Sequence, residues 1–569
     1  MSSSYSPGER ARSVRDRARS SEHTSPGLLA EPVEPRTNRR RWIGLAAGLL
    51  AALLVYFSMP QDLDPAARLT AATAVLMGIW WMTEALPIPA TALVPLVVFP
   101  VFGGVDIEEV GSSYGNDIIF LFMGGFILAL AMQRWNLHRR IALMTVSAMG
   151  TRSTMVIAGF MLATGFLSMW VSNTATTVMM LPIGVSVLLL VTNLGVTGGR
   201  GEEAPAAGAG EANDDVALAR GREDPAGADP TGAEAGGSAD DGESARAVDA
   251  EVKEAVIASN FGTALMLGIA YAASVGSLST IIGTPPNTLL VGYMNDAHGV
   301  DIGFGQWMLV GLPLAAVMLF LVWFLLTKVL FKPEIDEIPG GREPIRRQLR
   351  ELGPMSTGEK LVLAMFALAA LSWVFMPMIA KGLISDAGIA MTVSILLFLL
   401  PAGAGRGVRL LDWESAVKLP WGVLLLFGGG LALSAQFSAS GLTEWIGQQA
   451  QALGTVPLVL LVVIMATGVI FLTELTSNTA TAATFLPVAG GVALGLGVDP
   501  LMLAVPVALA ATCAFMLPVA TPPNAIAYGS GYVTIGQMMR GGIWLNVAGI
   551  VLITVVTMSL LVWVFQPGG

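Results

Sequence analysis

The chain has 569 residues, of which 54% are hydrophobic and only 13% are charged. This composition excludes an ordinary soluble protein, because apolar runs of about 17–25 residues, long enough to cross ~30 Å of hydrocarbon, recur along the chain. The formal net charge of −10 says little about partners, since the acidic residues gather in one insert. The single cysteine, Cys513, excludes an internal disulfide and argues against a cysteine metal site.

The predicted elements begin after a tail. Residues 1–41 are rich in Arg and Ser and lack an apolar core, so we expect a disordered cytoplasmic segment there. Apolar runs then predict an all-α polytopic membrane protein with about 11 transmembrane helices. The predicted spans are 43–59, 68–86, 88–103, 117–133, a pair within 153–194, 256–294, 307–331, 360–380, 386–402, 420–438, a pair within 456–495, 500–530 and 541–565.

Basic residues set the predicted orientation, because cytoplasmic loops carry an excess of Lys and Arg. Clusters within 39–41, 134–140, 328–350 and 406–418 fall on one side if each paired segment is a re-entrant hairpin that enters and leaves by the same face. This arrangement predicts a multi-pass protein of the plasma (inner) membrane, with the N-terminus in the cytoplasm and the C-terminus outside.

Two polar motifs occur once in each half of the chain. Ser172-Asn-Thr-Ala-Thr-Thr-Val-Met-Met-Leu-Pro182 returns 305 residues later, starting at Ser477, with seven of eleven residues identical. Thr284-Pro-Pro-Asn287 returns as Thr521-Pro-Pro-Asn524 after only 237 residues. An acidic insert at 198–252, expected to be disordered and cytoplasmic, accounts for most of the difference. An odd number of crossings between the halves predicts an inverted repeat, typical of transporters.

The repeated motifs carry groups that bind small ions. Asn173 and Asn478 can each offer an oxygen to a cation or an N–H to an anion, and Ser168 and Thr473 supply a hydroxyl one turn earlier. Such neutral oxygens suit Na⁺. The Pro-Pro pairs interrupt spanning helices, which frees backbone carbonyls on one side and a helix N-terminus, favourable to anions, on the other. The alternative is that these polar residues merely bond between packed helices.

Fixed positive charge is missing around the predicted site. No Lys or Arg occurs between Lys253 and Lys328, nor between Lys418 and Arg540. An anionic substrate would therefore depend on bound cations and helix N-termini, although a neutral substrate fits the same observation. Glu474, inside the second hairpin, could tune a cation site, carry a proton or form a structural pair.

The two Ser-Asn-Thr motifs, the two Thr-Pro-Pro-Asn motifs and the hairpin before each resemble the divalent anion/sodium symporter family over about 43–565. The resemblance implies symport of C4-dicarboxylates (succinate, fumarate, malate) or citrate with two or more Na⁺. It also implies a homodimer that works by an elevator motion, with interfacial arm helices at 134–152 and 440–455. No nucleic-acid partner is expected.

The resemblance further implies the site residues. One Na⁺ would be held by Ser168, Ser172, Asn173 and the carbonyl of Gly283, and another by Thr473, Thr476, Asn478 and the carbonyl of Ala520. The substrate would meet Ser172, Asn173, Thr174, Thr284, Ser477, Asn478, Thr479, Thr521 and Pro522.

These inferences divide the chain into nine segments. The scaffold would comprise 42–152 and 359–455, each ending in an arm helix, and 332–358 would be a cytoplasmic loop. The transport domain would comprise the two hairpins, 153–197 and 456–495, and the broken helices with their following spans, 253–331 and 496–569. The tail 1–41 and the insert 198–252 complete the division.

Other functions fit these motifs less well. An intramembrane enzyme lacks a histidine base, because His23, His138 and His298 all fall in tail or loops. No Gly-x-x-x-x-Gly-Lys-Ser/Thr loop supports a nucleotide-driven pump. A sulfate/sodium symporter and a proton-coupled or exchange-mode dicarboxylate transporter stay open as alternatives.

Overall fold

The computed structural model describes residues 35–197, 259–338, 343–380, 382–451 and 456–566. Within these ranges the regular elements are helices, and isolated bridges join Arg152 to Glu337 and Pro401 to Arg409. Most of the predicted tail and the whole insert 198–252 lie outside the described residues. The prediction of an all-helical protein is confirmed for the part of the chain that the structure describes.

Seven helical stretches among the described residues are long and apolar enough to cross a membrane. The finer prediction of about 11 crossings is not tested by these lengths. The seven are Pro35–Ser58, Ile107–Arg134, Asn260–Ser279, Phe304–Leu330, Thr357–Ile379, Trp421–Ala439 and Ile535–Phe565.

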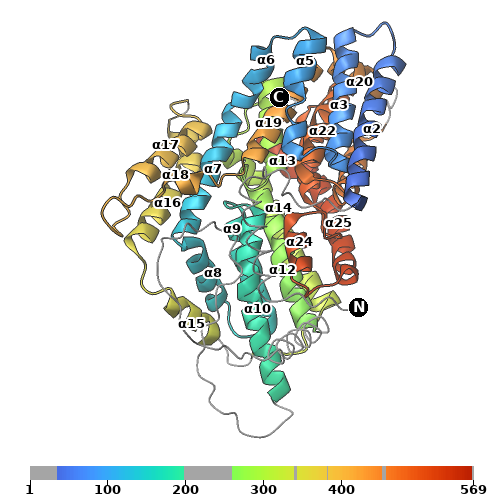
Figure 1. The fold of residues 1–569 in the computed structure, drawn as a ribbon. Coiled ribbons are helices and arrows are strands. Elements are labelled where there is room, and N and C mark those ends of the chain that lie inside the picture. The colour runs from blue at the N-terminus through green and yellow to red at the C-terminus, as the bar shows by residue number, and fades with distance from the viewer. Residues whose placement is uncertain (1–34, 198–258, 339–342, 381, 452–455, 567–569) are drawn as a thin grey trace, which may run out of the picture.

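The first half of the chain starts with two long helices, α2 and α3, that pack along each other at one edge of the molecule (Figure 1). α3 begins where Pro65 takes the first helical position and Asp64 accepts a hydrogen bond from the N–H of Ala66. The helices of this half are α2 (Pro35–Ser58), α3 (Pro65–Thr83), α4 (Ile88–Thr91), α5 (Pro95–Gly103), α6 (Ile107–Ser112), η2 (Ser113–Gly115), α7 (Asp117–Arg134), α8 (Leu137–Ala148), α9 (Ser153–Ser168), α10 (Asn173–Thr197), α12 (Asn260–Gly276), η3 (Ser277–Ser279), α13 (Pro285–His298), α14 (Phe304–Phe324) and η4 (Leu325–Leu330).

The second half runs in a similar order. α16 and α17 lie at the edge of the molecule opposite α2 and α3, and α17 packs along α7 (Figure 1). The helices are α15 (Glu343–Glu351), α16 (Thr357–Ile379), α17 (Asp386–Leu399), α18 (Trp413–Ala416), α19 (Trp421–Ala439), α20 (Leu442–Gln451), α21 (Leu458–Thr473), α22 (Asn478–Gly495), α23 (Leu501–Thr512), α24 (Pro522–Gly529), α25 (Ile535–Val556), η5 (Thr557–Leu561) and α26 (Val562–Phe565).

Each half contains a helical hairpin at the predicted place. Four residues, 169–172, join α9 to α10, and four residues, 474–477, join α21 to α22. The first helix of each hairpin, α9 or α21, has 16 residues. At about 1.5 Å per residue such a helix is roughly 24 Å long, which is shorter than ~30 Å of hydrocarbon.

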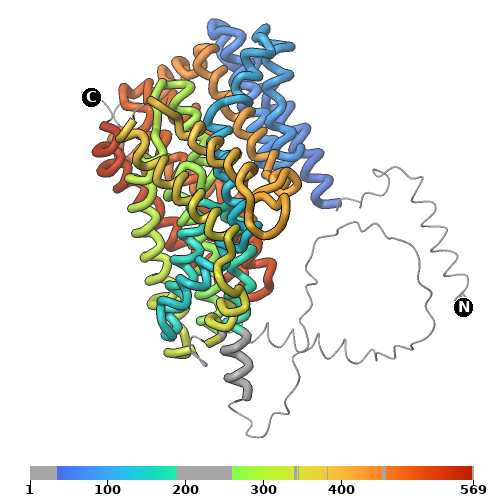
Figure 2. Tube along the Cα trace, turned by 90° about the vertical axis from the view of Figure 1, so that its left-hand side faces the viewer, coloured from blue at the N-terminus to red at the C-terminus, as the bar shows by residue number. Residues whose placement is uncertain are grey.

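Each half also contains a helix interrupted before its Pro-Pro pair. α12 passes through η3, stops near Thr280 and resumes as α13 at Pro285, while α23 stops at Thr512 and the chain resumes as α24 at Pro522. Proline suits the first turn of a helix because its missing N–H would find no partner there. The halves interlock around these interruptions, since α13 packs against α22 and α23, and α24 packs against α10 and α12. The chain seen from the side is an elongated bundle, in which segments from both halves lie together (Figure 2).

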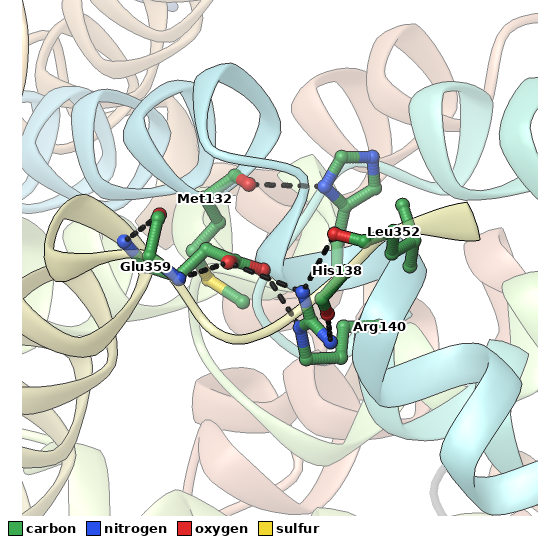
Figure 3. Close-up of polar contacts among 7 residues, drawn as sticks. Met132, His138, Arg140, Leu352 and Glu359 are labelled. Carbon is green, nitrogen blue, oxygen red and sulfur yellow. Dashed lines mark hydrogen bonds and ion pairs between the residues drawn. The ribbon is translucent and has the colours of Figure 1, made fainter. Parts of the chain in front are cut away.

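Short helices lie at the predicted arm segments, α8 within 134–152 and α20 within 440–455. α8 is fixed to the start of α16 by a buried ion pair, in which Nε of Arg140 lies 2.8 Å from Oε1 of Glu359 and Nη2 lies 3.2 Å from Oε2 (Figure 3). Arg140 also donates to the carbonyl of Gly353 at 3.0 Å, and Nδ1 of His138 lies 3.0 Å from the carbonyl of Met132. α8 is therefore held by contacts with residues of both halves.

Candidate functional site

The first Ser-Asn-Thr motif lies where the turn of the first hairpin meets α12. Ser168 ends α9, and its Oγ donates to the carbonyl of Ala273 at 2.6 Å and lies 3.3 Å from Oδ1 of Asn173. Nδ2 of Asn173 donates to Oγ of Ser277 at 3.3 Å, and that hydroxyl donates to the carbonyl of Ser274 at 2.8 Å. Hydroxyl, amide and carbonyl groups from the hairpin and the interrupted helix thus meet in one buried cluster.

The second Ser-Asn-Thr motif repeats this arrangement against α23. Thr473 ends α21, and its Oγ1 lies 3.0 Å from the carbonyl oxygen of Ala511 and 2.9 Å from Oδ1 of Asn478. Ser168 and Thr473 are both fully buried. The structure therefore brings together the hydroxyl, amide and backbone groups that the repeat aligned by sequence.

The surroundings of Asn478 show what kind of ion this cluster suits. Its Oδ1 lies 3.1 Å from the carbonyl oxygen of Ala520 and 3.3 Å from that of Ala511, and neither carbonyl can donate a proton. A half-turn of the amide would instead let its nitrogen donate to both carbonyls and to Thr473. After that half-turn the amide itself satisfies the three oxygens. Carbonyl, hydroxyl and amide groups that converge in this way are also hard ligands of the kind that bind Na⁺. The residues present therefore fit the predicted cation.

The last asparagine of each Thr-Pro-Pro-Asn motif holds the interrupted segment in place. Asn287 and Asn524 are fully buried, and each Nδ2 donates to the backbone carbonyls ten and seven residues earlier. Within the described residues their Oδ1 atoms have no hydrogen-bond partner. The bonds run from Asn287 to Ser277 (3.4 Å) and Thr280 (2.9 Å), and from Asn524 to Ala514 (3.4 Å) and Leu517 (3.1 Å). Sequence reasoning gave these asparagines no role, although their recurrence in the motif was the available signal.

Four helix N-termini begin at these motifs. α10 and α22 start at Asn173 and Asn478, and α13 and α24 start at Pro285 and Pro522. The interrupted helices touch through Thr284, whose Oγ1 lies 3.4 Å from Oγ1 of Thr512. Helix N-termini carry partial positive charge and attract anions. The site therefore combines oxygen clusters that suit cations with backbone ends that suit anions.

The other predicted substrate residues differ in exposure. Thr174 and Pro522 are exposed, whereas Ser172, Ser477 and Thr479 are half-buried. Thr521 is buried, and its hydroxyl accepts from the N–H of Asn524 at 3.3 Å, which caps α24. The exposed members are the ones that a substrate arriving from water could reach.

Two further predicted cation ligands are Thr476 and Gly283. The hydroxyl of Thr476 donates to the carbonyl of Leu472 at 3.0 Å and lies 2.8 Å from that of Thr481, so its side chain is engaged away from Asn478. At Gly283 a Cβ would lie only 2.3 Å from the carbonyl oxygen of Ser277. This close approach requires glycine at the end of the first interruption.

The two hairpin tips have different surroundings. Trp170 is buried and contacts three rings: its centroid lies 4.9 Å from that of Phe366, 6.3 Å from that of Trp373 and 6.0 Å from that of Phe304. Phe366 and Trp373 belong to α16. The matching residue of the second hairpin, Leu475, is 64% exposed. In this conformation the first tip is therefore docked on α16 and the second tip is open.

This set of hairpins, interrupted helices and motifs matches a known family. A family model described as the sodium:sulfate symporter transmembrane region matches residues 39–566. The chain belongs to this family. The family resemblance drawn from the motifs is thus confirmed, and the chain is a membrane transporter rather than an enzyme.

Individual relatives are similar over most of the chain. Proteins named sodium-dependent dicarboxylate transporter SdcS, from Staphylococcus saprophyticus and Staphylococcus aureus (strain USA300), are 42% and 40% identical to it over 521 residues. Each alignment covers 90% of this chain and 90% of the relative. Among solved structures, the YdaH transporter of Alcanivorax borkumensis and MtrF of Neisseria gonorrhoeae are 13% identical, with TM-scores of 0.48 and 0.45. They cover 85% and 94% of this chain, and each is itself covered over 97%.

Proposed function

We propose that this protein is a sodium-coupled symporter of small divalent anions, with C4-dicarboxylates or citrate as substrates. The observation that carries this proposal is the pair of matched oxygen clusters, around Asn173 and Asn478, at helix N-termini in a region without Lys or Arg. The names of the two Staphylococcus relatives support sodium dependence and dicarboxylate as substrate.

Two Na⁺ ions would bind at the two clusters. Ser168, Ser172, Asn173 and the Gly283 carbonyl would hold one, and Thr473, Thr476, Asn478 and the Ala520 carbonyl the other. The convergence of Thr473, Asn478 and two carbonyls supports the second set. For Thr476 the backbone rather than the hydroxyl would serve, because the hydroxyl already bonds to Leu472. The clusters around Asn173 and Asn478 are the two proposed cation sites.

The substrate would bridge the two hairpin turns. Its carboxylates would accept from the amides of Asn173 and Asn478 and from the hydroxyls of Ser172, Thr174, Ser477, Thr479, Thr284 and Thr521. Pro522 has no N–H to donate and would only contact the substrate. Because no basic side chain occurs in these segments, the two bound cations and four helix N-termini would balance the dianion.

The proposed cycle uses a moving transport domain. The first helices of the two hairpins, α9 and α21, have 16 residues each and fall short of a full crossing. This length supports re-entrant hairpins in an inverted repeat. The hairpins and interrupted helices would move as an elevator against α2–α7 and α16–α19, linked by α8 and α20. We further propose a homodimer in the inner membrane with a cytoplasmic N-terminus and an external C-terminus.

Uptake of labelled succinate by proteoliposomes tests this function. An inward Na⁺ gradient should drive uptake, and the same gradient of K⁺ or protons should not. Uptake that needs only dicarboxylate on the opposite side would establish exchange, and proton-driven uptake without Na⁺ would establish proton coupling. Because the family description names sulfate, sulfate is the runner-up substrate, and stronger inhibition by unlabelled sulfate than by unlabelled succinate would favour it.

A further inference from the structure

A buried carboxylate links the second hairpin to the second interrupted helix. Glu474, the first residue of the turn, is 3% exposed. Its Oε1 accepts from the backbone N–H groups of Phe515 at 2.8 Å and Met516 at 2.9 Å, and its Oε2 accepts from that of Leu517 at 3.0 Å. Nδ2 of Asn546, on α25, also donates to Oε1 at 2.7 Å. One side chain thus captures three successive N–H groups of the interruption.

The partners of Glu474 suit a carboxylate. Every group that contacts its oxygens is a hydrogen-bond donor. Within the described residues no Lys, Arg or His forms an ion pair with it. Glu474 is therefore a buried carboxylate whose oxygens are held by neutral donors.

The first half has no such group. The residue that matches Glu474 is Met169, and the described part of the first hairpin, 153–197, contains no charged residue. There the same stretch of the interruption forms the turn η3, so the backbone satisfies itself. From the turn of the first hairpin, the carbonyl of Met169 accepts from Oγ1 of Thr280 at 2.5 Å.

Glycines explain why the first interruption stays closed. A Cβ at Gly276 would lie 2.2 Å from the carbonyl oxygen of Gly165, so α9 and α12 touch through their backbones. The matching residues of the second half are the larger Ile470 and Cys513. Side chains at these positions replace the glycine-to-glycine backbone contact of the first half. The N–H groups of the second interruption, at 515–517, find their acceptor in Glu474.

We propose that Glu474 is a positioning residue that makes the two cation sites unequal. It holds the second interruption open around the carbonyls of Ala511 and Ala520, and it places a fixed negative charge beside Thr473. The first site has neither feature. The second site therefore binds Na⁺ first and more tightly, and the first site fills only at higher Na⁺. This inference rests on the proposed function and adds to it an order of binding.

Electrostatics sets the expected size of the inequality. Opposite charges a few ångströms apart in a partly buried site attract strongly, because little water screens them. We expect removal of the charge to raise the Na⁺ concentration for half-saturation of the second site about tenfold or more.

Thermal unfolding of the purified full-length protein in detergent tests the proposal without transport. Na⁺ replaces choline at constant ionic strength, without substrate, and a bound ion raises the unfolding temperature. In the wild type, stabilisation should begin at low Na⁺ and rise again at higher Na⁺. Glu474→Gln and Thr473→Ala should both remove the low-Na⁺ rise, whereas Ser168→Ala should remove only the later one. Met169→Leu is the matched control and should leave the curve unchanged.

Two results would overturn the proposal. One is a folded Glu474→Gln protein that keeps the low-Na⁺ rise. The other is an equal effect of Ser168→Ala and Thr473→Ala on that rise, a comparison that decides the matter even if Glu474→Gln does not fold. A wild-type unfolding curve that is identical in Na⁺ and choline would contradict the proposed sodium coupling itself. This outcome is visible in the wild-type protein alone, before any variant is made.

Discussion

Asn173 and Asn478 occupy matched positions, yet each is fixed by a different set of neighbours. Asn173 lies between the hydroxyls of Ser168 and Ser277, whereas Asn478 faces two backbone carbonyls and Thr473. An amide is suited to both places because it carries a donor and an acceptor on one carbon. Replacing it with a carboxylate keeps the shape and removes the donor.

Asn173→Asp and Asn478→Asp should each abolish dicarboxylate uptake while the protein stays folded and inserted. The new charge repels the substrate carboxylates and cannot donate to them. The measurement is succinate uptake at saturating Na⁺, with the yield of monodisperse protein as the check on folding. Asn295→Asp, which makes the same change at an exposed position, is the control and should transport normally. Near-normal uptake by either site variant would remove that motif from the site.

Ser168→Ala and Thr473→Ala should each raise the Na⁺ concentration needed for half-maximal uptake. Each change removes one hydroxyl oxygen without adding charge, and the substrate affinity at saturating Na⁺ should change less, because mass action refills a weakened site. The measurement is a Na⁺ titration of initial uptake rates. Thr164→Ala removes a buried hydroxyl that bonds within its own helix, to Phe160, and should not shift the titration. An unshifted Ser168→Ala or Thr473→Ala would exclude that hydroxyl as a ligand.

At this scale the sequence predicted residue types better than contacts. The 305-residue spacing aligned Ser168 with Thr473 and Asn173 with Asn478. In the structure each hydroxyl lies beside the asparagine of its own hairpin. It could not show that the hydroxyl of Thr476 is engaged by Leu472, since a hydroxyl one turn from a carbonyl can point either way. The sequence also did not reveal the hydrogen bonds that Asn287 and Asn524 donate across the interruptions. Their acceptors are backbone carbonyls, which every residue carries, so no residue type marks them in a sequence.

At the scale of elements, the short helix α8 is fixed by a buried ion pair. The side chains of Arg140 and Glu359 are 10% and 7% exposed, and Arg140 also bonds to the backbone before α16. A buried charge that loses its partner is costly, because nothing then replaces its hydration. The pair therefore makes the position of α8 sensitive to single substitutions.

Arg140→Met should lower the stability of the protein by about 3 kcal/mol, since Glu359 would stay buried without a partner. Adding Glu359→Gln should restore part of the loss. The measurement is the thermal unfolding midpoint in detergent for the single and double variants. Arg139→Met, on the same helix but half-buried, serves as the control and should change the midpoint little. A double variant less stable than Arg140→Met would contradict the role of the ion pair.

His138 gives the same helix a pH dependence. Burial lowers the pKa of its imidazole, more than the bond to the carbonyl of Met132 raises it. The unfolded chain then binds a proton more readily than the folded protein, so stability should fall as pH drops below ~6.5, the ordinary histidine value. His138→Gln should reduce the change of the thermal unfolding midpoint between pH 7 and pH 5. An unchanged slope in the variant would assign the pH dependence to other groups.

The interruptions of α12 and α23 were predictable from the Pro-Pro pairs, and the structure places them there. Their difference was not predicted. It depends on Gly165 and Gly276, whose backbones touch, and on larger residues at the matching positions of the second half. The sequence contains glycines in the first half and larger residues in the second half. It does not show that these positions face each other, because that depends on which helices pack together.

At the scale of the molecule, the fold class and family followed from composition and repeated motifs. Orientation, the elevator motion and the dimer stay proposals, because they depend on a membrane and a second chain. Within the chain, any motion of the first hairpin against α16 must separate Trp170 from Phe366 and Trp373.

Deleting residues 198–252, the acidic insert, should leave Na⁺-driven uptake intact. The segment has the composition of a chain that cannot form a core, and shortening a long connection changes its closure entropy only slightly. The measurement compares initial uptake rates per inserted protein. A deletion of the same length elsewhere offers no fair comparison, so replacement by a short Gly-Ser linker is the control. Severe loss in both well-expressed versions would indicate that the insert regulates transport.

Cys513, at the start of the second interruption, is fully buried and is the single thiol of the chain. Maleimides and spin labels react with accessible thiolates, so the folded wild-type protein should be nearly silent toward them. Cysteines introduced at exposed positions, such as Leu475 at the open hairpin tip, can then be modified selectively with the native residue left in place. The natural chain is thus already a background for site-directed labelling of the hairpins.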